Sequence, residues 1–356
     1  MKSRHGVPIL GNSDTKLSMI DGAVLYKNLR ETITKEGILE RDYFYYAFLF
    51  VISMLGFLFS AFLLFVNFST LLMPLYLISF VIFGVQLAGL FHDAGHRAIF
   101  KSAKNNDLIG YFTAFVANIG FSYWKYKHNQ HHANPNEIDA DPDIDIPLFS
   151  FTKKKKQQNF LTRGLLKYQA YLYYPLGSTA LLFERYKSLV YIKNNFKKAM
   201  IFEIAFLIVS SFFWYVLPFL VLPPLQAILF IFLTNFGVGI YLANIFAPNH
   251  KGMPQVAKGL KISFLEHQVR TARNIKSGPV AETFYVGLNY QTEHHLFPNC
   301  PRRKLGLITP HLKKLCRQMG VEYTETGVIE SNKIILRELS NTAQVKLRSK
   351  PNITKG

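Results

Sequence analysis

Residues 44–66 read FYYAFLFVISMLGFLFSAFLLFV and contain no charged side chain. A helix rises about 1.5 Å per residue, so a run of this length can cross a hydrocarbon core about 30 Å thick. Residues 71–91 (LLMPLYLISFVIFGVQLAGLF) form a second such run, and 201–222 and 225–247 form a further pair whose only charged residue is Glu203. Because a chain in lipid must satisfy its own backbone hydrogen bonds, the sequence predicts an all-α polytopic membrane protein with four transmembrane helices.

The connections and the charges predict how the spans are arranged. The linkers inside the two pairs, 67–70 and 223–224, are so short that each pair is expected to form a hairpin. All 41 lysines and arginines lie outside the hairpins, and such residues mark the cytoplasmic side. We therefore expect transmembrane hairpins at 44–91 and 201–247 beneath a cytosolic helical cap. The other expected segments are a cytosolic N-terminal segment at 1–43, cap regions at 92–200 and 248–339, and a flexible tail at 340–356.

The remaining composition excludes some functions and leaves others open. The net charge of +19 suits a positive-inside membrane protein near anionic lipid better than a nucleic-acid-binding protein. The run KKKK at 153–156 is expected to be solvated, or else to meet an acidic electron carrier or substrate phosphates. Residues 108–121 are too short to span, and 168–183 are interrupted by Pro-Leu-Gly, so both are predicted to be helices at the membrane interface. Two cysteines exclude a disulfide framework.

Seven of the eleven histidines fall into three clusters. The clusters are HDAGH (His92, His96), HNQHH (His128, His131, His132) and QTEHH (His294, His295). Residues three and four apart share a helix face, so each of the first two clusters presents imidazoles in one direction. Three clusters on one side of the membrane predict a metal site, and seven imidazoles are too many for one ion.

The ligand types narrow the choice of metal. Structural zinc commonly uses cysteine, and zinc proteases of the HExxH type need a glutamate between the histidines, and neither pattern is present. Imidazole suits iron, and di-iron centres on helices are known. A metal transporter or sensor is an alternative from another class, but transporters place ionisable groups near the bilayer midplane, whereas these spans are almost free of them.

In this order, with an apolar pair between the second and the third, HDAGH, HNQHH and QTEHH resemble the three histidine boxes of the integral-membrane fatty-acid desaturases, over roughly residues 20–325. The third box begins with Gln291, and GLNYQTEHHLFP is similar to the front-end group, which inserts a double bond between an existing one and the carboxyl end. The resemblance implies oxygen-dependent, cis desaturation at a histidine-ligated pair of irons on the cytoplasmic face, with O2 as co-substrate.

The substrate class stays open at this point. The resemblance implies a long acyl chain in a kinked tunnel, with acyl-CoA or acyl-lipid favoured and an acyl carrier protein as a further alternative. A di-iron hydroxylase of a lipid, alkane or carotenoid on the same scaffold is the nearest competing reading of the sequence. Basic side chains near the boxes could hold substrate phosphates; they are Arg97, Lys125, Lys127, Arg270 and Arg273.

The resemblance also implies one more histidine ligand between the fourth span and the third box. His250 in FAPNHKG is the first choice and His267 in LEHQVRTARN is the second. The expected catalytic residues are the seven box histidines, and the expected metal ligands are those seven with His250. His5 and His311 fit no such spacing and are expected to be structural or surface residues.

A ligating imidazole usually donates its other N–H to a carboxylate or a carbonyl. Asp93 is therefore a predicted partner, as is the run DADPDID at 139–145, in which Asp141 and Asp143 resemble acidic positions of the family. A solvated loop or helix cap is an equally good interpretation of that run.

Two residues of the third box are expected to be neither ligand nor base. Gln291 is a weaker ligand than imidazole and is predicted to orient a neighbouring ligand or a water. Glu293 is predicted to face away. Many front-end enzymes also carry a fused haem domain marked by His-Pro-Gly-Gly, which residues 1–43 do not contain. A separate electron donor is therefore expected, either a ferredoxin or a free cytochrome with its reductase.

Overall fold

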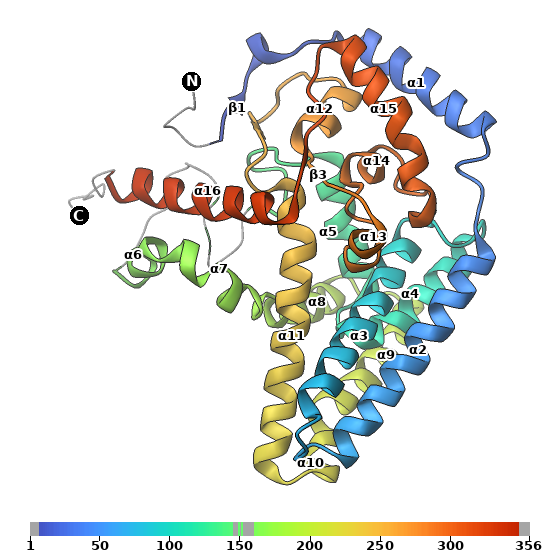
Figure 1. Ribbon diagram of the computed structural model, residues 1–356, viewed down its shortest axis with the longest axis vertical. Helices are drawn as coiled ribbons and strands as arrows, with labels where there is room; N and C mark the ends of the chain where they lie inside the picture. Colours follow the sequence, from blue (N-terminus) through green and yellow to red (C-terminus); the bar gives the residue numbers. More distant parts are fainter. Residues whose placement is uncertain (1–6, 145–148, 150, 152–159, 349–356) are drawn as a thin grey trace.

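The computed structural model describes residues 7–144, 149, 151 and 160–348, and most of this chain is helical (Figure 1). The KKKK run and His5 lie outside the described residues. The helices are α1 (Met19–Lys35), α2 (Tyr43–Val66), α3 (Met73–Gly95), α4 (Ala103–Ala117), α5 (Phe121–Ala133), α6 (Phe160–Lys167), α7 (Gln169–Gly177), α8 (Ala180–Asn194), α9 (Ile201–Ser211), α10 (Leu217–Val221), α11 (Pro224–His250), α12 (Phe264–Thr271), α13 (Pro279–Phe284), α14 (Gln291–Leu296), α15 (Leu305–Met319) and α16 (Val328–Arg348).

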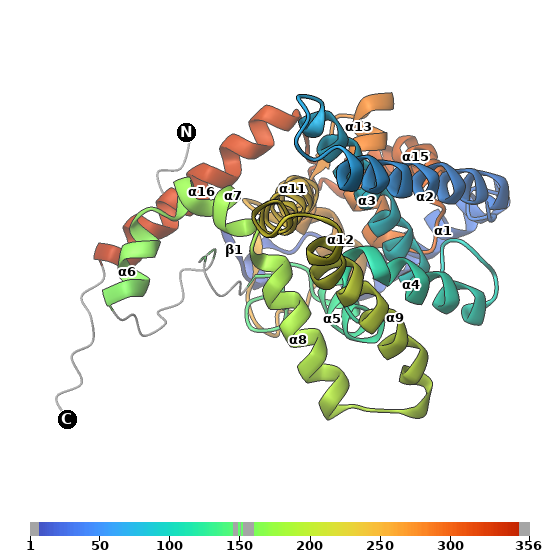
Figure 2. The ribbon, with the colours of Figure 1, turned by 90° about the horizontal axis from the view of Figure 1, so that it is seen from below.

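Four helical segments of the described chain are long and apolar enough to cross a membrane, and they match the four predicted spans. They are Tyr43–Val66, Met73–Gly95, Lys198–Val221 and Pro224–His250. The second and the fourth run past their predicted ends, because the helix continues into polar residues that include His92 and His250. These long helices run through the lower part of Figure 1, and α11 is seen nearly end-on in Figure 2.

The third span is not a regular helix throughout. Between α9 and α10, Phe212–Val216 form a wider π-type turn directly before Pro218. Proline has no backbone N–H, so a regular hydrogen-bond ladder cannot run through it. Within this span, Ser210 and the buried Trp214 donate to the carbonyl of Phe115 at the end of α4 (2.5 and 3.2 Å). The third span therefore satisfies carbonyls that α4 cannot satisfy itself.

The two stretches predicted to be short helices are helical. Residues 108–117 belong to α4, which packs against α3 and α9, and the second stretch forms α7 and the start of α8. The helix is interrupted between α7 and α8 at Ser178 and Thr179, shortly after Pro175. Their position at a membrane interface stays a prediction.

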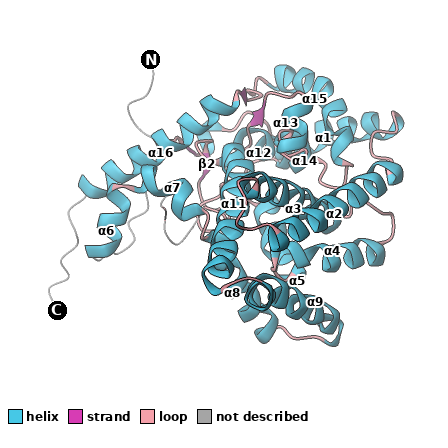
Figure 3. Ribbon diagram, turned by 60° about the horizontal axis from the view of Figure 1, so that its bottom comes forward, coloured by secondary structure: helices cyan, strands magenta, loops and turns pink. Residues whose placement is uncertain are grey.

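Above the long helices, a cap is built from α1, α12, α14 and α15 (Figure 1). Its core includes Ile33, Leu265, Leu296 and Ile308, each at most 1% exposed. The strands are short, as Figure 3 shows. Two parallel pairs join distant segments: β1 (Ile9–Leu10) with β2 (Gln255–Val256), and β3 (Asn274–Ile275) with β4 (Glu325–Thr326).

The C-terminal region is helical further than the sequence predicted. We expected a flexible tail from residue 340, but α16 continues to Arg348. Ile335, Leu339 and Ala343 recur at helical spacing and are buried, and the first two pack with Tyr173 of α7. This apolar face packs α16 against the rest of the protein. The segment is polar overall, so its composition did not indicate this face.

Candidate metal centre

All seven box histidines and His250 lie at one place in the fold. The first box ends α3, the second is on α5, the third is on α14, and His250 ends α11. Ring centroids from different boxes are as close as 4.1 Å for His132 and His295 and 4.4 Å for His96 and His132. The predicted convergence of distant clusters is therefore observed.

The histidines divide into two sets. In the first, ring nitrogens of His92, His96, His128 and His294 lie within 4.8 Å of one another, and in the second those of His131, His250 and His295 do so. His132 lies between them: its Nε2 is 3.1 Å from Nε2 of His128 and 3.2 Å from that of His294, and its ring stacks on His295. His92 and His294 are buried, as is the whole second set, whereas His96, His128 and His132 are half-buried.

These nitrogens are spaced as ligands of an ion would be. Two nitrogens about 2.1 Å from one ion and at right angles to each other would lie about 3.0 Å apart. His250 Nε2 is 3.0 Å from His295 Nε2 and 3.3 Å from His131 Nε2. In the first set, Nε2 of His92 and of His96 are buried and have no hydrogen-bond partner among the described residues. The donor set therefore fits two imidazole-bound ions.

The surroundings keep most of these imidazoles in the neutral form that binds metals. Burial and the charges of neighbouring imidazoles hold the pKa of each of five of them well below its ordinary value. The five are His96, His128, His132, His294 and His295. His131 differs, because the Asp141 carboxylate outweighs the effect of burial and raises the pKa of His131.

The predicted carboxylate partners contact the histidines. Nδ1 of His92 lies 3.1 Å from Asp93, and Nδ1 of His131 lies 3.0 Å from Asp141 and 3.7 Å from Asp143. A proton on each Nδ1 leaves Nε2 as the lone-pair nitrogen, and Nε2 is the atom that faces the other rings. Asp141 is buried and accepts the backbone N–H groups of Asn136 and Asp143, so this part of the acidic run holds a histidine.

A family model described as fatty acid desaturase matches residues 68–327, which contain every one of these histidines. The chain belongs to the fatty acid desaturase family. This is a family of oxidoreductases.

Curated relatives carry desaturase names. The chain is 29% identical over 314 residues to an acyl-lipid (9-3)-desaturase of Borago officinalis, covering 83% of this chain and 68% of the relative. It is 28% identical over 275 residues to a protein of the same name from Physcomitrium patens, covering 73% and 51%. It is 27% identical over 337 residues to a Delta(6)-fatty-acid desaturase of Caenorhabditis elegans, covering 90% and 75%. The chain thus spans about half of the moss relative and two thirds or more of the other two.

In this desaturase, His250 and not His267 joins the histidine sets. His250 directs Nε2 at His131 and His295, while its Nδ1 lies 2.9 Å from the carbonyl of Thr271. His267 is buried and donates from Nε2 to the carbonyl of Pro135 (2.8 Å), in the loop that follows the second box. His250 therefore lies within the second histidine set, whereas His267 holds the loop after the second box.

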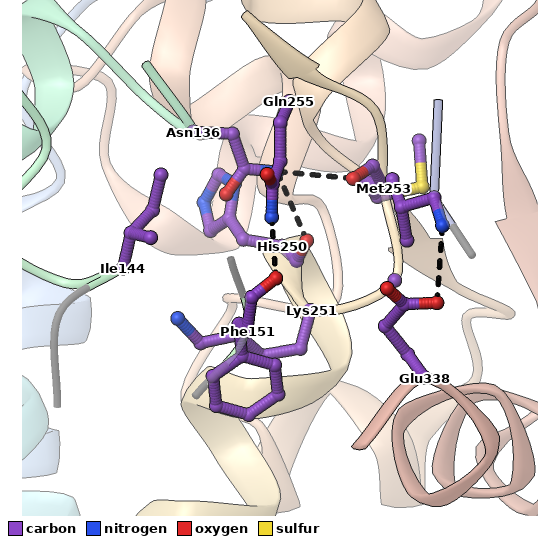
Figure 4. A pocket seen from close by; sticks show the side chains of 10 residues that line it. Asn136, Ile144, Phe151, His250, Lys251, Met253, Gln255 and Glu338 are labelled. Carbon is purple, nitrogen blue, oxygen red and sulfur yellow. Dashed lines mark hydrogen bonds between the residues drawn. The ribbon is translucent and has the colours of Figure 1, made fainter. Parts of the chain in front are cut away.

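The turn after α11 is held by a residue that sequence reasoning missed. The buried Asn136 amide donates to the carbonyls of His250 (3.1 Å) and Pro254 (3.2 Å), and Figure 4 shows it against this turn. Asn136 has φ +56°, a left-handed conformation that asparagine tolerates better than most residues. The Asn-Pro-Asn that follows HNQHH is a turn signal that could have identified it.

Other residues of the third box lie as predicted or close to it. The Gln291 amide nitrogen is 2.9 Å from Nε2 of His250, and the Gln291 amide oxygen accepts from Asn249, so Gln291 contacts a histidine of the second set. Glu293 faces away from the histidines, but it is buried and accepts bonds from Asn274, Thr309 and Tyr323. Gln268, which no pattern indicated, accepts from Nδ1 of His295 (2.8 Å).

The basic residues considered for phosphate binding are mostly engaged within the protein. Arg97 is exposed, and the other four have partners. These contacts are Lys125 with Asp107 (2.6 Å), Lys127 with Asp143 and Glu184 (2.9 and 3.1 Å), Arg270 with Glu266 (2.9 Å), and Arg273 with the Lys251 carbonyl (2.9 Å). Of these five side chains, only Lys127 lines the cavity described next.

A cavity of about 290 Å³ reaches the histidines of both sets. His92, His128, His131 and His250 form part of its wall. The rest is mainly apolar and comes from α3, α7, α8 and α11, including Val85, Leu181, Gly239, Leu242 and Phe246. Four of the charged wall residues, Lys127, Asp143, Glu184 and Lys187, are linked by ion pairs and form one polar patch. The cavity thus combines an apolar chamber, imidazoles and a charged patch.

Proposed function

We propose that this protein is an oxygen-dependent fatty acyl desaturase of the front-end type, which inserts a cis double bond into a long acyl chain. The observation that carries the proposal is the cavity wall, where histidines of both sets meet a chamber of apolar side chains. An acyl chain has no polar group near the reacting carbons, so it can be held only by such a surface.

Two iron ions, with O2 as co-substrate, would supply the oxidation that removes hydrogen from an unactivated methylene. We propose His92, His96, His128 and His294 for one ion and His131, His250 and His295 for the other, with His132 between them. Asp93 and Asp141 keep the Nδ1 protons of His92 and His131 in place, the Thr271 carbonyl does the same for His250, and Gln291 lies beside Nε2 of His250. The apolar wall excludes water from the reacting carbons.

The proposal includes a topology. The two pairs of spans form hairpins that enter the membrane from the cytosol, and the boxes, α12, α14 and α15 form a cytosolic cap. Two features support it: the lysines and arginines all lie outside the spans, and both histidine-bearing spans carry their histidines at one end.

For the substrate we favour an acyl-lipid or acyl-CoA. The names of the plant and moss relatives support an acyl-lipid, and the name of the nematode relative supports a front-end position. The head group would lie at the polar patch of Lys127, Asp143, Glu184 and Lys187, with the chain in the apolar chamber. The electrons would come from a separate ferredoxin or cytochrome with its reductase.

Lipid profiling tests the proposal. The protein is expressed in cells that lack polyunsaturated fatty acids and are fed a panel of unsaturated acyl chains, and the products are identified by gas chromatography with mass spectrometry. We expect a new cis double bond on the carboxyl side of an existing one, absent with the His128→Ala variant. A hydroxylated product with no new alkene would instead assign the protein to the hydroxylases.

A further inference from the structure

The carboxylate that holds His92 is itself held by two residues from outside the boxes. Asp93 contacts Nδ1 of His92 through one oxygen, and its other oxygen accepts from Nε of Arg302 (2.5 Å) and from the Tyr46 hydroxyl (2.8 Å). The Tyr46 hydroxyl in turn accepts the backbone N–H of Arg302 (3.2 Å). All four residues are at most 5% exposed, so these contacts are shielded from water.

Two glycines provide the space that Arg302 occupies. A Cβ atom on Gly89, one turn before His92 on α3, would lie 2.7 Å from both Nη atoms of Arg302. A Cβ atom on Gly287 would lie 2.7 Å from the Arg302 Cβ, and Gly287 also has φ +82°, where side chains are disfavoured. The arginine is therefore fitted tightly between the first span pair and the segment that leads into the third box.

Stability alone does not account for this arginine. Burying a charge is unfavourable unless it is fully paired and hydrogen-bonded, and apolar side chains of similar size often serve as well. Nη1 and Nη2 of Arg302 have no hydrogen-bond partner among the described residues. Only Nε and the backbone N–H are used, and both act on the Asp93–Tyr46 pair.

The second histidine set is supported differently. Asp141, which holds His131, accepts backbone N–H groups of Asn136 and Asp143 at 2.8 Å each. In the described part of the chain no arginine contacts Asp141. The arginine is thus specific to the first set, where it links the segment after the third box to the first box.

We propose that Arg302 is a positioning residue for the first metal site. With Tyr46 it fixes the Asp93 carboxylate, so that His92 carries its proton on Nδ1 and presents the Nε2 lone pair to the ion. Arg302 thereby connects the first box with the segment that follows the third box. This inference rests on the metal centre of the proposed function.

The test uses the full-length protein, purified with iron, and compares Arg302→Met with Arg302→Lys. Methionine keeps the apolar volume but cannot donate, whereas lysine keeps a donor and a charge. Arg303→Met is the matched control, because Arg303 is the next residue and its side chain is exposed. The readouts are iron content during titration with a chelator, and Mössbauer spectra that distinguish the two irons.

We expect Arg302→Met to lower the affinity for one of the two irons about 10-fold to 100-fold, because loss of a ligand's hydrogen-bond partner typically has an effect of this size. The spectrum of the other iron should be unchanged, Arg302→Lys should be intermediate, and Arg303→Met should match the wild type. Equal retention of both irons with unchanged spectra in Arg302→Met would overturn the inference while leaving the proposed function intact. Wild-type protein that binds no iron would contradict the proposed function itself.

A further variant guards against misfolding of Arg302→Met. Gly89→Ala keeps Arg302 but places a methyl group where the guanidinium lies. We expect it to weaken binding of the same iron in the chelator titration while the other iron stays bound, which a globally misfolded protein would not show. Gly89→Ala protein that holds both irons as tightly as the wild type would contradict the inference.

Discussion

The position of each histidine side chain decides whether its substitution affects the metal centre. His128 belongs to the first set and His295 to the second, and both face the interior of the cluster. His311, by contrast, is partly exposed and contacts Glu36 near the surface. The histidines therefore differ in role although the residue type is the same.

We predict that His128→Ala and His295→Ala each abolish desaturation and lower the iron content from two ions to one or none. An imidazole ligand lost from a buried site is not replaced by a methyl group or by solvent in the same geometry. His311→Ala should keep activity and both irons. Product analysis and iron determination on purified protein check this, and an active His128→Ala enzyme would remove His128 from the ligand set.

The Lys127–Asp143 pair gives a prediction about pH. Burial raises the pKa of Asp143, but the charge of Lys127 outweighs this and holds the pKa below its ordinary value. A lowered carboxyl pKa contributes stability that is present above the ordinary value of about 4 and is lost as the pH falls through the lower folded value. We expect the melting temperature in detergent to fall below about pH 4. The fall should be shallower in Lys127→Met, and identical profiles would refute the pairing.

For individual residues, the sequence predicted the contacts that join positions close together along the chain. The HxxxH and HxxHH spacings, Asp93 beside His92, and Asp141 ten residues after His131 could all be recognised along the chain. Arg302 could not, because it meets Asp93 from 209 residues away. Such long-range contacts depend on how the cap packs against the spans in the folded protein.

Among the elements, α5 depends on a charge in the third span. The N-cap of α5 is Gly120, which has no side chain, and the buried Glu203 of α9 accepts the N–H of Ser122 instead (2.9 Å). A carboxylate at a helix N-terminus also interacts favourably with the helix dipole. Glu203, the one charged residue of the apolar runs recognised in the sequence, thereby holds the helix that carries the second box.

We predict that Glu203→Ala lowers the free energy of unfolding by about 1–2 kcal/mol, the usual effect of losing an N-cap. Glu203→Gln should lose less, because an amide oxygen can still accept from Ser122. Glu31→Ala on the exposed face of α1 is the matched control. Denaturation in detergent measures the three, and a Glu203→Ala protein as stable as the control would show that α5 does not need this cap.

Helix ends were the part of each element that the sequence predicted least well. Hydropathy ended the second span at residue 91 and the fourth at 247, whereas α3 and α11 continue to Gly95 and His250. A helix does not stop where apolar residues stop, since its backbone hydrogen bonds continue in water as well as in lipid.

For the whole molecule, the apolar runs and the placement of basic residues predicted four spans with the histidines near one end of two of them. The shape of the cavity could not be predicted, because α7, α8 and α11 form it by packing. Gly177 shows this: it lines the cavity, and an added Cβ would contact only Ala243, at 3.8 Å.

We predict that Gly177→Leu narrows the chamber and lowers conversion of the longest accepted acyl chain by about ten-fold or more, while shorter chains are affected less. Gly177→Ala should have a small effect, since the methyl group fits the space present. The iron content should stay at the wild-type level in both variants. Product profiles over a series of chain lengths test this, and an unchanged profile for Gly177→Leu would place the acyl chain elsewhere.

In the proposed metal centre, histidines from three distant segments and His250 together hold two irons. The most direct measurement is an experimental structure of the iron-loaded protein with anomalous scattering at the iron edge. We expect two iron peaks, one among His92, His96, His128 and His294 and one among His131, His250 and His295. A single peak, or iron bound away from these residues, would contradict the account.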